Sequence, residues 1–286
     1  MRLTLCDSHV HVFDPGRFPY APQRRFTPGP AGVGALRAHL ARIGAARVVL
    51  VQPSVYGTDH ACLLDALAQL GPTARGVGVL APDTSPVVVD ALDRAGVRGA
   101  RLNLAVDGDR DIGRARRRIA GIDAIIPDRW HVQLHAAPEV LAGLADDIAA
   151  CGRHFVADHF ALATAAQGPD TPAWARLLPL AAAGRLTVKL SAPYLGSARP
   201  APYLDMKPFV LRLARANPGA IVWGSNWPHT QGTGRKPDDD PGRIEPFRTE
   251  NDGAWLAVCE AWLQAAGLAP DRLDRNAQAL YGFGPG

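Results

Sequence analysis

The sequence of 286 residues predicts an α/β fold, specifically a (β/α)8 TIM barrel. We expect residues 1–286 to form this barrel as a single domain. Eight short apolar segments alternate with longer segments of helical periodicity, an order that predicts parallel βαβ units. Eight such units close into a barrel, which typically takes about 250 residues. A doubly wound open sheet is the alternative, and the lack of a Gly-x-Gly-x-x-Gly turn after the first strand disfavours it.

The first strand is predicted over residues 3–14, where apolar and polar residues alternate with period two. His9 and His11 therefore share one face of this strand. A buried imidazole needs a polar partner, and it both binds divalent metals and transfers protons near neutral pH. The pair predicts a ligand between the rings, either a metal ion or a polarised carbonyl oxygen. Two half-exposed histidines without a function are the alternative.

The remaining elements follow in a regular order. Residues 15–30 hold five prolines and lack periodicity, so we predict a long loop that forms a lid or a wall over the substrate. Helices are predicted at 35–43, 59–70, 86–95, 112–125, 138–150, 172–183, 206–216 and 253–266. Strands are predicted at 47–52, 75–80, 99–104, 131–135, 154–158, 186–190 and 220–223, and the first of these is a continuous apolar run, typical of a strand covered on both faces.

Composition argues against several classes of protein. Apolar residues make up 47% and charged residues 20%, with no apolar run long enough to cross a bilayer, so no membrane partner is expected. The net charge of +4 is spread along the chain, which argues against nucleic acid as a partner. Four scattered cysteines form no Cys-x-x-Cys pair and no secretory signal is visible, so we expect a cytoplasmic protein. The sequence does not predict an oligomeric state.

The active site of such a barrel lies at the carboxyl ends of its strands. Polar residues collect at these predicted ends: His9, His11, Gln52, Ser54, Arg101, Asn103, His135, Asp158, His159, Lys189, Ser191, Asn226 and His229. A single one of these histidines would more often be a paired core residue. Several of them at one end of one barrel favour a functional site.

Six motifs that contain these residues resemble the amidohydrolase superfamily, in its 2-pyrone-4,6-dicarboxylate lactonase branch. The motifs are His-x-His at 9–11 and the segments 51–54, 98–103, 158–160, 188–191 and 222–229, and the likeness extends from Cys6 to Phe283. The resemblance implies a hydrolytic barrel in which His9, His11 and His159 hold a metal or polarise a lactone carbonyl. It also implies that Ser54, Arg101 and His229 bind substrate, and that Asn226 occupies the place of the acid that activates water.

The chain departs from this pattern at Asn226, at His135 and Leu195, which stand in place of a tyrosine and an arginine, and near Phe26, where the branch has a tyrosine. A carboxamide cannot accept a proton, so Asn226 would orient water while His9, His11, His135 or His159 acts as the base. We predict a lactonase that hydrolyses the ring ester of a carboxylated lactone in aromatic or sugar-acid catabolism. Its predicted catalytic residues are His9, His11, His159 and Asn226, and its predicted substrate-binding residues are Ser54, Arg101, His135, Lys189, Ser191 and His229.

Three alternatives stay open at this point. The chain would be a sugar-lactone isomerase of the galactarolactone isomerase type, which also carries Asn at this position, a barrel that binds a ligand without turnover, or a variant in which Asn226 replaces a native aspartate. No cofactor is expected to be required, although His9, His11 and His135 offer three nitrogens for zinc or manganese. Arg101 is predicted to anchor the small carboxylated lactone, the alternative being an ion pair with Asp107 or Asp109.

Overall fold

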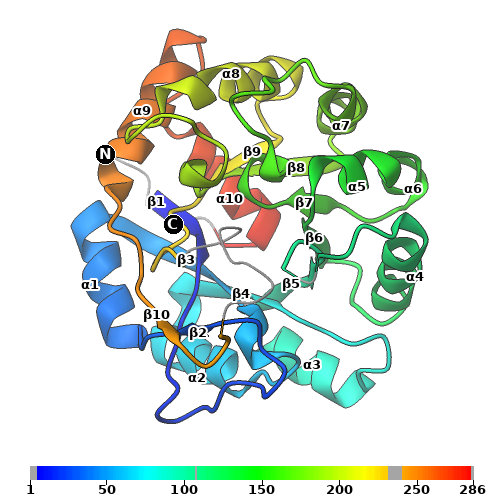
Figure 1. The fold of residues 1–286 in the computed structure, drawn as a ribbon, viewed down its shortest axis with the longest axis vertical. Helices are drawn as coiled ribbons and strands as arrows, with labels where there is room; N and C mark the ends of the chain where they lie inside the picture. Colours follow the sequence, from blue (N-terminus) through cyan, green and yellow to red (C-terminus); the bar gives the residue numbers. More distant parts are fainter. Residues whose placement is uncertain (1–4, 107, 231–239, 285–286) are drawn as a thin grey trace.

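A computed structural model describes residues 5–106, 108–230 and 240–284. Eight parallel strands form a ring with helices around its outside, as the sequence predicted (Figure 1). The strands are β1 Leu5–Val10, β3 Ala45–Val51, β4 Ala74–Gly78, β5 Val97–Asn103, β6 His131–His135, β7 Phe155–Ala157, β8 Leu186–Leu190 and β9 Ile221–Trp223. Each strand pairs with its neighbours in chain order, from β1 to β9, which is the (β/α)8 barrel arrangement.

The ring closes where the residues after β9 meet β1. Val10 forms a parallel bridge with Trp227, the His11 amide donates to the Trp227 carbonyl at 2.8 Å, and the Asn226 amide donates to the His9 carbonyl at 2.8 Å. Gly224 lies so close to β1 that a Cβ atom there would be 2.7 Å from the His9 Cβ. This seam therefore fixes Asn226 beside the His-x-His segment.

Ten helices of the described residues surround the strands, and none of them is both long and apolar enough to cross a bilayer. They are α1 Val33–Ile43, α2 Ala61–Leu70, α3 Pro86–Arg94, α4 Ile112–Asp123, α5 Pro138–Gly143, α6 Ala145–Ala150, α7 Pro172–Ala182, α8 Lys207–Ala216, α9 Asp252–Ala265 and α10 Arg272–Tyr281. The helix predicted over 138–150 is in fact two, α5 and α6. They divide at Leu144, whose ψ of 0° interrupts the helical backbone.

Helix α10 was not predicted, and it covers the end of the barrel opposite the pocket. Asp274 accepts a hydrogen bond from the Cys6 amide at 3.2 Å, and the Asn276 side chain donates to the Pro218 and Ile221 carbonyls, both at 2.7 Å. Tyr281 is fully buried in a small cluster that includes Val49 and Val222. These contacts hold α10 against β1 and β9, so the helix closes the end of the barrel opposite the pocket.

The predicted loop over residues 15–30 contains a short element that the sequence did not indicate. Strand β2, Thr27–Pro28, pairs in parallel with β10, Ile244–Glu245, from a distant part of the chain. Strand β1 ends at Val10 rather than at 14, because the backbone then turns toward the Phe13–Ala31 bridge. Leu3 and Thr4 of the predicted strand lie outside the described residues.

The interior of the barrel holds a buried histidine, His131, that packs closely against a glycine. His131 is 2% exposed, and a Cβ atom on Gly99 of the neighbouring strand would be 2.5 Å from its ring. We expect Gly99→Ala to destabilise the protein by about 1–3 kcal/mol, because a methyl group cannot fit there. Gly34→Ala is the control, since nothing lies within 4 Å of a Cβ atom at Gly34. Equal free energies of unfolding for the two variants in urea would contradict this prediction.

Candidate active site

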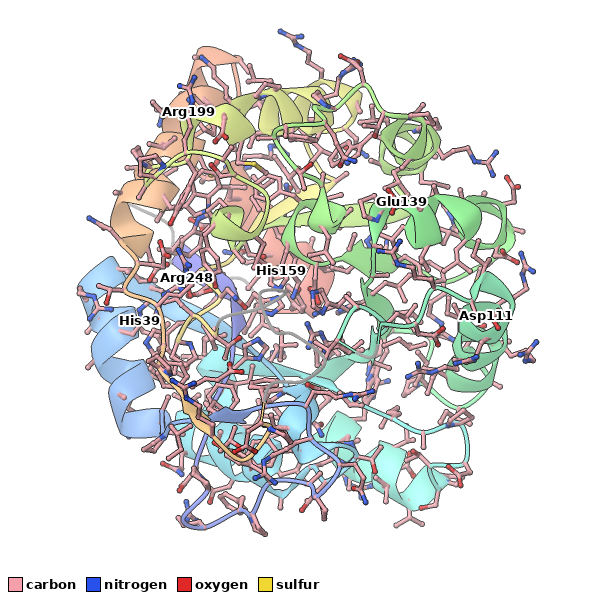
Figure 2. All side chains as sticks on the ribbon, viewed as in Figure 1. His39, Asp111, Glu139, His159, Arg199 and Arg248 are labelled. Atoms are coloured by element: carbon pink, nitrogen blue, oxygen red, sulfur yellow. The ribbon has the colours of Figure 1, made fainter. Side chains whose placement is uncertain are left out.

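The carboxyl ends of the strands enclose a pocket with about 440 Å³ of space, its open mouth included. Side chains from most of the strand ends and from the loop before α1 line it: His11, Phe13, Phe26, Pro53, Ser54, Arg101, Asn103, Val106, His135, His159, Leu195, Asn226 and Thr230. Figure 2 shows His159 close to the middle of the ring. The pocket therefore lies where the fold predicts an active site.

The two histidines of β1 touch each other. The Nε2 atoms of His9 and His11 are 3.3 Å apart, and His11 Nδ1 lies 2.7 Å from the Val51 carbonyl. A carbonyl only accepts, so neutral His11 carries its hydrogen on Nδ1 and a lone pair on Nε2. Burial, with Arg101 adding to it, lowers the pKa of His11 to about 3, so this ring is neutral at pH 7.

A buried carboxylate and two cations lie beneath the histidines. Asp158 accepts from Arg101 Nε at 2.9 Å, and its other oxygen is 3.3 Å from His9 Nδ1 and 3.9 Å from Lys189 Nζ. Burial alone would raise the pKa of Asp158, but Arg101, His9 and Lys189 outweigh it and hold this pKa well below its usual range. Burial lowers the pKa of Lys189 to about 8, which still leaves it mainly cationic at pH 7. The cluster is therefore net positive beside the pocket.

His159 is held by an unusual backbone turn. Its Nδ1 is 2.8 Å from Ser191 Oγ, and its ring centre is 4.6 Å from that of His9. Residues His159 to Leu162 all have φ between 51° and 56°, a left-handed conformation that non-glycine residues rarely adopt. Such residues cost of the order of 1–3 kcal/mol each and persist where the surroundings enforce them, often at functional sites. The turn aims His159 into the pocket.

His135 has a defined tautomer. Asn103 Oδ1 is 3.1 Å from the Val106 amide, a donor, so this atom is an oxygen. The same oxygen is 2.9 Å from His135 Nδ1. Neutral His135 therefore carries its hydrogen on Nδ1 and a lone pair on Nε2.

Asn226 lies at the seam of the barrel, where the residues after β9 meet β1. Its φ of 66° is left-handed, a region in which Asn and Asp are enriched. Its Nδ2 donates to the Tyr194 hydroxyl at 2.7 Å, while its Oδ1 is buried without a hydrogen-bond partner among the described residues. The amide oxygen can therefore accept a hydrogen bond from a group at this wall of the pocket.

The structure brings together most of the predicted residues. His11, Ser54, Arg101, His135, His159 and Asn226 line the pocket, and His9 lies directly behind its wall. Lys189, Ser191 and His229, also predicted to bind substrate, are buried and are not among the residues that line it. Lys189 contacts His9 and Ser191 contacts His159 from behind. Gln52 bonds the backbone of Gly57, Asp59 and Val79, and so it holds the loop together.

Among the described residues, Arg101 does not form the ion pair with Asp109 that was its alternative role. Its partner is Asp158, while Asp109 lies near Arg114 and Arg118, and Asp107 lies outside the described residues. The sequence analysis missed Tyr194, Thr230 and Asp252, which contact or adjoin the predicted residues. No periodicity singles them out, since they come from turns and a helix start. Only the proximity of Tyr194 to the 188–191 motif was a signal.

The described residues include one group close enough to share a metal ion, His9, Asp158 and His159, with ligand atoms within 4.8 Å of one another. The 3.3 Å spacing of the His9 and His11 Nε2 atoms also matches the separation of two ligands on one tetrahedral zinc, about 3.3 Å for bonds of 2.0–2.1 Å. The charges fit less well. Asp158 is already neutralised by Arg101 and Lys189, and these buried cations would repel a divalent ion.

Comparison with known proteins assigns the class. The amidohydrolase family model matches residues 6–283, so the chain belongs to the amidohydrolase family. Within it, the chain falls in the branch of the 2-pyrone-4,6-dicarboxylate hydrolases, since such an enzyme from Comamonas testosteroni is 31% identical over 250 residues, covering 82% of this chain and 79% of the relative.

Two further relatives are named for reactions of lactones. A 4-sulfomuconolactone hydrolase from Rhizobium radiobacter is 29% identical, covering 96% of this chain and 89% of its own. A D-galactarolactone isomerase from Agrobacterium fabrum is 28% identical, covering 82% and 80%. The solved structure of a Pseudomonas putida protein assigned as a 2-pyrone-4,6-dicarboxylic acid hydrolase has a TM-score of 0.76 and 30% identity, covering all of both chains.

Proposed function

We propose that this protein hydrolyses the ring ester of an anionic lactone. The observation that carries the proposal is the Arg101 guanidinium in the pocket wall beside the neutral imidazoles of His11 and His159. A guanidinium binds a carboxylate or sulfonate in a planar fork, and Arg101 spends only its Nε on Asp158 among the described hydrogen bonds. The names of two hydrolytic relatives also describe lactones that carry carboxylate or sulfonate groups.

The histidines supply the second requirement, polarisation of the lactone carbonyl. Burial lowers the pKa values of His9 and His159 well below the usual range, so both rings are neutral donors rather than cations at pH 7. Ser191 can donate its hydroxyl hydrogen to His159 Nδ1, which leaves an N–H on Nε2 to donate to a carbonyl oxygen. Such a fixed donor stabilises the negative charge that develops on this oxygen as water attacks.

The pocket suits an anion in a further respect. Among the described residues that line it, none carries a carboxylate. The place of the acid is taken by Asn226, whose buried Oδ1 can accept a hydrogen from water and orient it toward the carbonyl. An amide cannot remove that proton, so a histidine must act as the base.

Isomerisation is the second candidate, favoured by Asn226 and by the galactarolactone isomerase relative. In that reaction a hydroxyl of the substrate, rather than water, attacks the carbonyl. The test is to incubate the protein with 2-pyrone-4,6-dicarboxylate, 4-sulfomuconolactone and D-galactarolactone in water enriched in ¹⁸O. We expect a ring-opened acid that carries ¹⁸O in its new carboxylate. A rearranged lactone without ¹⁸O would establish the isomerase instead.

We further propose that turnover does not depend on a tightly held metal ion, because Arg101 and Lys189 already neutralise Asp158. Dialysis against a strong chelator should therefore leave kcat unchanged, and elemental analysis should find well under one ion per chain. Added zinc and manganese are the controls. Complete loss of turnover on chelation, with recovery in either ion, would contradict this proposal.

We also propose that the enzyme works in the cytoplasm in aromatic or sugar-acid catabolism. All four cysteines are free thiols, and three of them are buried, as expected in a reducing compartment.

A further inference from the structure

A second histidine arrangement, outside the cluster around Asp158, lies at the barrel seam. His229 is 4% exposed, and its Nε2 is 3.1 Å from Asp252 Oδ2 at the start of α9. A carboxylate only accepts, so neutral His229 carries its hydrogen on Nε2 and a lone pair on Nδ1. This Nδ1 is buried and has no hydrogen-bond partner among the described residues. A carboxylate that orients an imidazole with an unused lone pair is the arrangement of a general base.

Asp252 accepts a hydrogen bond from His229 and not from the nearby His39. Another histidine near this carboxylate, His39 of α1, has its Nδ1 3.8 Å from Asp252 Oδ2, beyond hydrogen-bond distance. Arg42 donates to that same His39 Nδ1 at 3.1 Å, so His39 carries its hydrogen on Nε2, which faces Asp7 at 3.3 Å. His39 therefore offers Asp252 no proton. Among the described residues, the one side chain that donates a hydrogen bond to Asp252 is His229.

His229 and Asn226 share one turn. The His229 amide donates to the Asn226 carbonyl at 2.9 Å, and both residues have left-handed φ values, 70° and 66°. The Tyr194 hydroxyl accepts from Asn226, while the Tyr194 ring packs edge-on against His229 at 6.1 Å. Asn226 and Thr230, on either side of His229 in the chain, line the pocket. The turn thus carries two buried acceptors without donors, Asn226 Oδ1 and His229 Nδ1.

Two unpaired acceptors on one turn suit a molecule that has two hydrogens to give, and water is such a molecule. We infer that Asn226 Oδ1 and His229 Nδ1 hold the nucleophilic water, with His229 as its proton acceptor and Asp252 as the positioning residue. This assignment rests on the proposed lactone hydrolysis and supplies the base that Asn226 cannot be.

The water oxygen bonds to the lactone carbonyl carbon, the carbonyl π pair moves to its oxygen, and the water proton passes to His229 Nδ1. Asp252 stabilises the imidazolium that results. The carbonyl then re-forms, the ring C–O bond breaks, and the proton moves from His229 to the departing ring oxygen. The product is a hydroxy acid or its keto form, and His229 returns to the neutral state.

The test uses the lactone among the three above that wild-type protein hydrolyses fastest. His229→Gln is expected to lower kcat by about 10²–10⁴-fold with little change in KM, because general-base catalysis is lost and binding is not. His154→Gln is the matched control, since His154 lies at the opposite end of the barrel, bonded to Gly184 and Thr187. Thermal unfolding of each variant checks the fold.

Two measurements separate a base from a structural histidine. The groups that face the Asp252–His229 pair are Tyr194, His39 and Arg248, whose amide donates to the His229 carbonyl, with Glu250 held by Arg248. All of these are unchanged in Asp252→Asn, so we expect the acid limb of kcat/KM to move to lower pH, because the imidazolium loses its carboxylate. Asp252→Glu should restore the limb in part.

In addition, Asn226→Asp placed in the His229→Gln background should recover at least tenfold in kcat, since a carboxylate would then face the same water.

Wild-type kcat and an unchanged acid limb in His229→Gln would overturn the assignment while leaving lactone hydrolysis intact. A folded, inactive His229→Gln that Asn226→Asp does not restore would also overturn it. If wild-type protein converts none of the three lactones to a ring-opened acid that carries ¹⁸O from the water, the proposed function is refuted, and this assignment with it.

Discussion

Arg101→Ala should raise KM for an anionic lactone by on the order of 10–100-fold, the loss expected when a charged hydrogen bond of about 1.5–3 kcal/mol is removed. Arg101 is buried at the end of β5, and its Nε already pairs with Asp158 at 2.9 Å. The fork that remains is therefore pre-oriented toward the pocket that it lines. Steady-state kinetics on the fastest lactone measure the effect.

The same variant also leaves Asp158 with less charge compensation, and breaking a buried pair destabilises a protein by about 3–5 kcal/mol. Arg101→Lys is the matched control, because it keeps a cation near Asp158 but loses the planar fork. We expect Arg101→Lys to retain most of the stability in urea and still to raise KM. An unchanged KM in both variants would rule out Arg101 as the anchor.

Gly224→Ala should lower both stability and turnover. A Cβ atom at this position would be 2.7 Å from the His9 Cβ and 2.8 Å from the His9 backbone nitrogen, neither of which can move without shifting β1. Overpacking of this kind costs about 1–3 kcal/mol, and a displacement of about 1 Å at a reacting group can cost 10²-fold in rate. Because Asn226 bonds the His9 carbonyl across the same seam, both residues would shift.

Gly152→Ala provides the comparison for Gly224→Ala, since nothing lies within 4 Å of a Cβ atom at Gly152. Urea unfolding and kcat on one lactone are measured for both variants. If Gly224→Ala retains the stability and kcat of Gly152→Ala, the seam does not position His9 as we describe.

The sequence by itself determined the number and order of the barrel strands and the end at which the site lies. Period-two and period-3.6 patterns are local, so they can be read from a single chain. Parallel strands then bring their carboxyl ends together whatever the loops do. His11, Arg101, His135, His159 and Asn226 line one pocket for this reason.

Tertiary structure decided which partner each of these groups has. Nothing local to Asp252, at the start of α9, indicates that it meets His229, since they are 23 residues apart and on separate elements. The pairing of β2 with β10 and the seal formed by α10 likewise depend on long-range contacts without a periodic signal.

The protonation state of the site residues also depends on the tertiary structure. Isolated histidine titrates near pH 6.5, whereas burial beside Arg101 lowers the pKa of His11 to about 3. Lys189 and Ser191 lie behind His9 and His159 rather than in the pocket. The burial of a residue near a strand end depends on the side chains that pack over it from other strands. The type of side chain determines which proton transfers are possible. Solvent exclusion and neighbouring charges determine which protonation state is present.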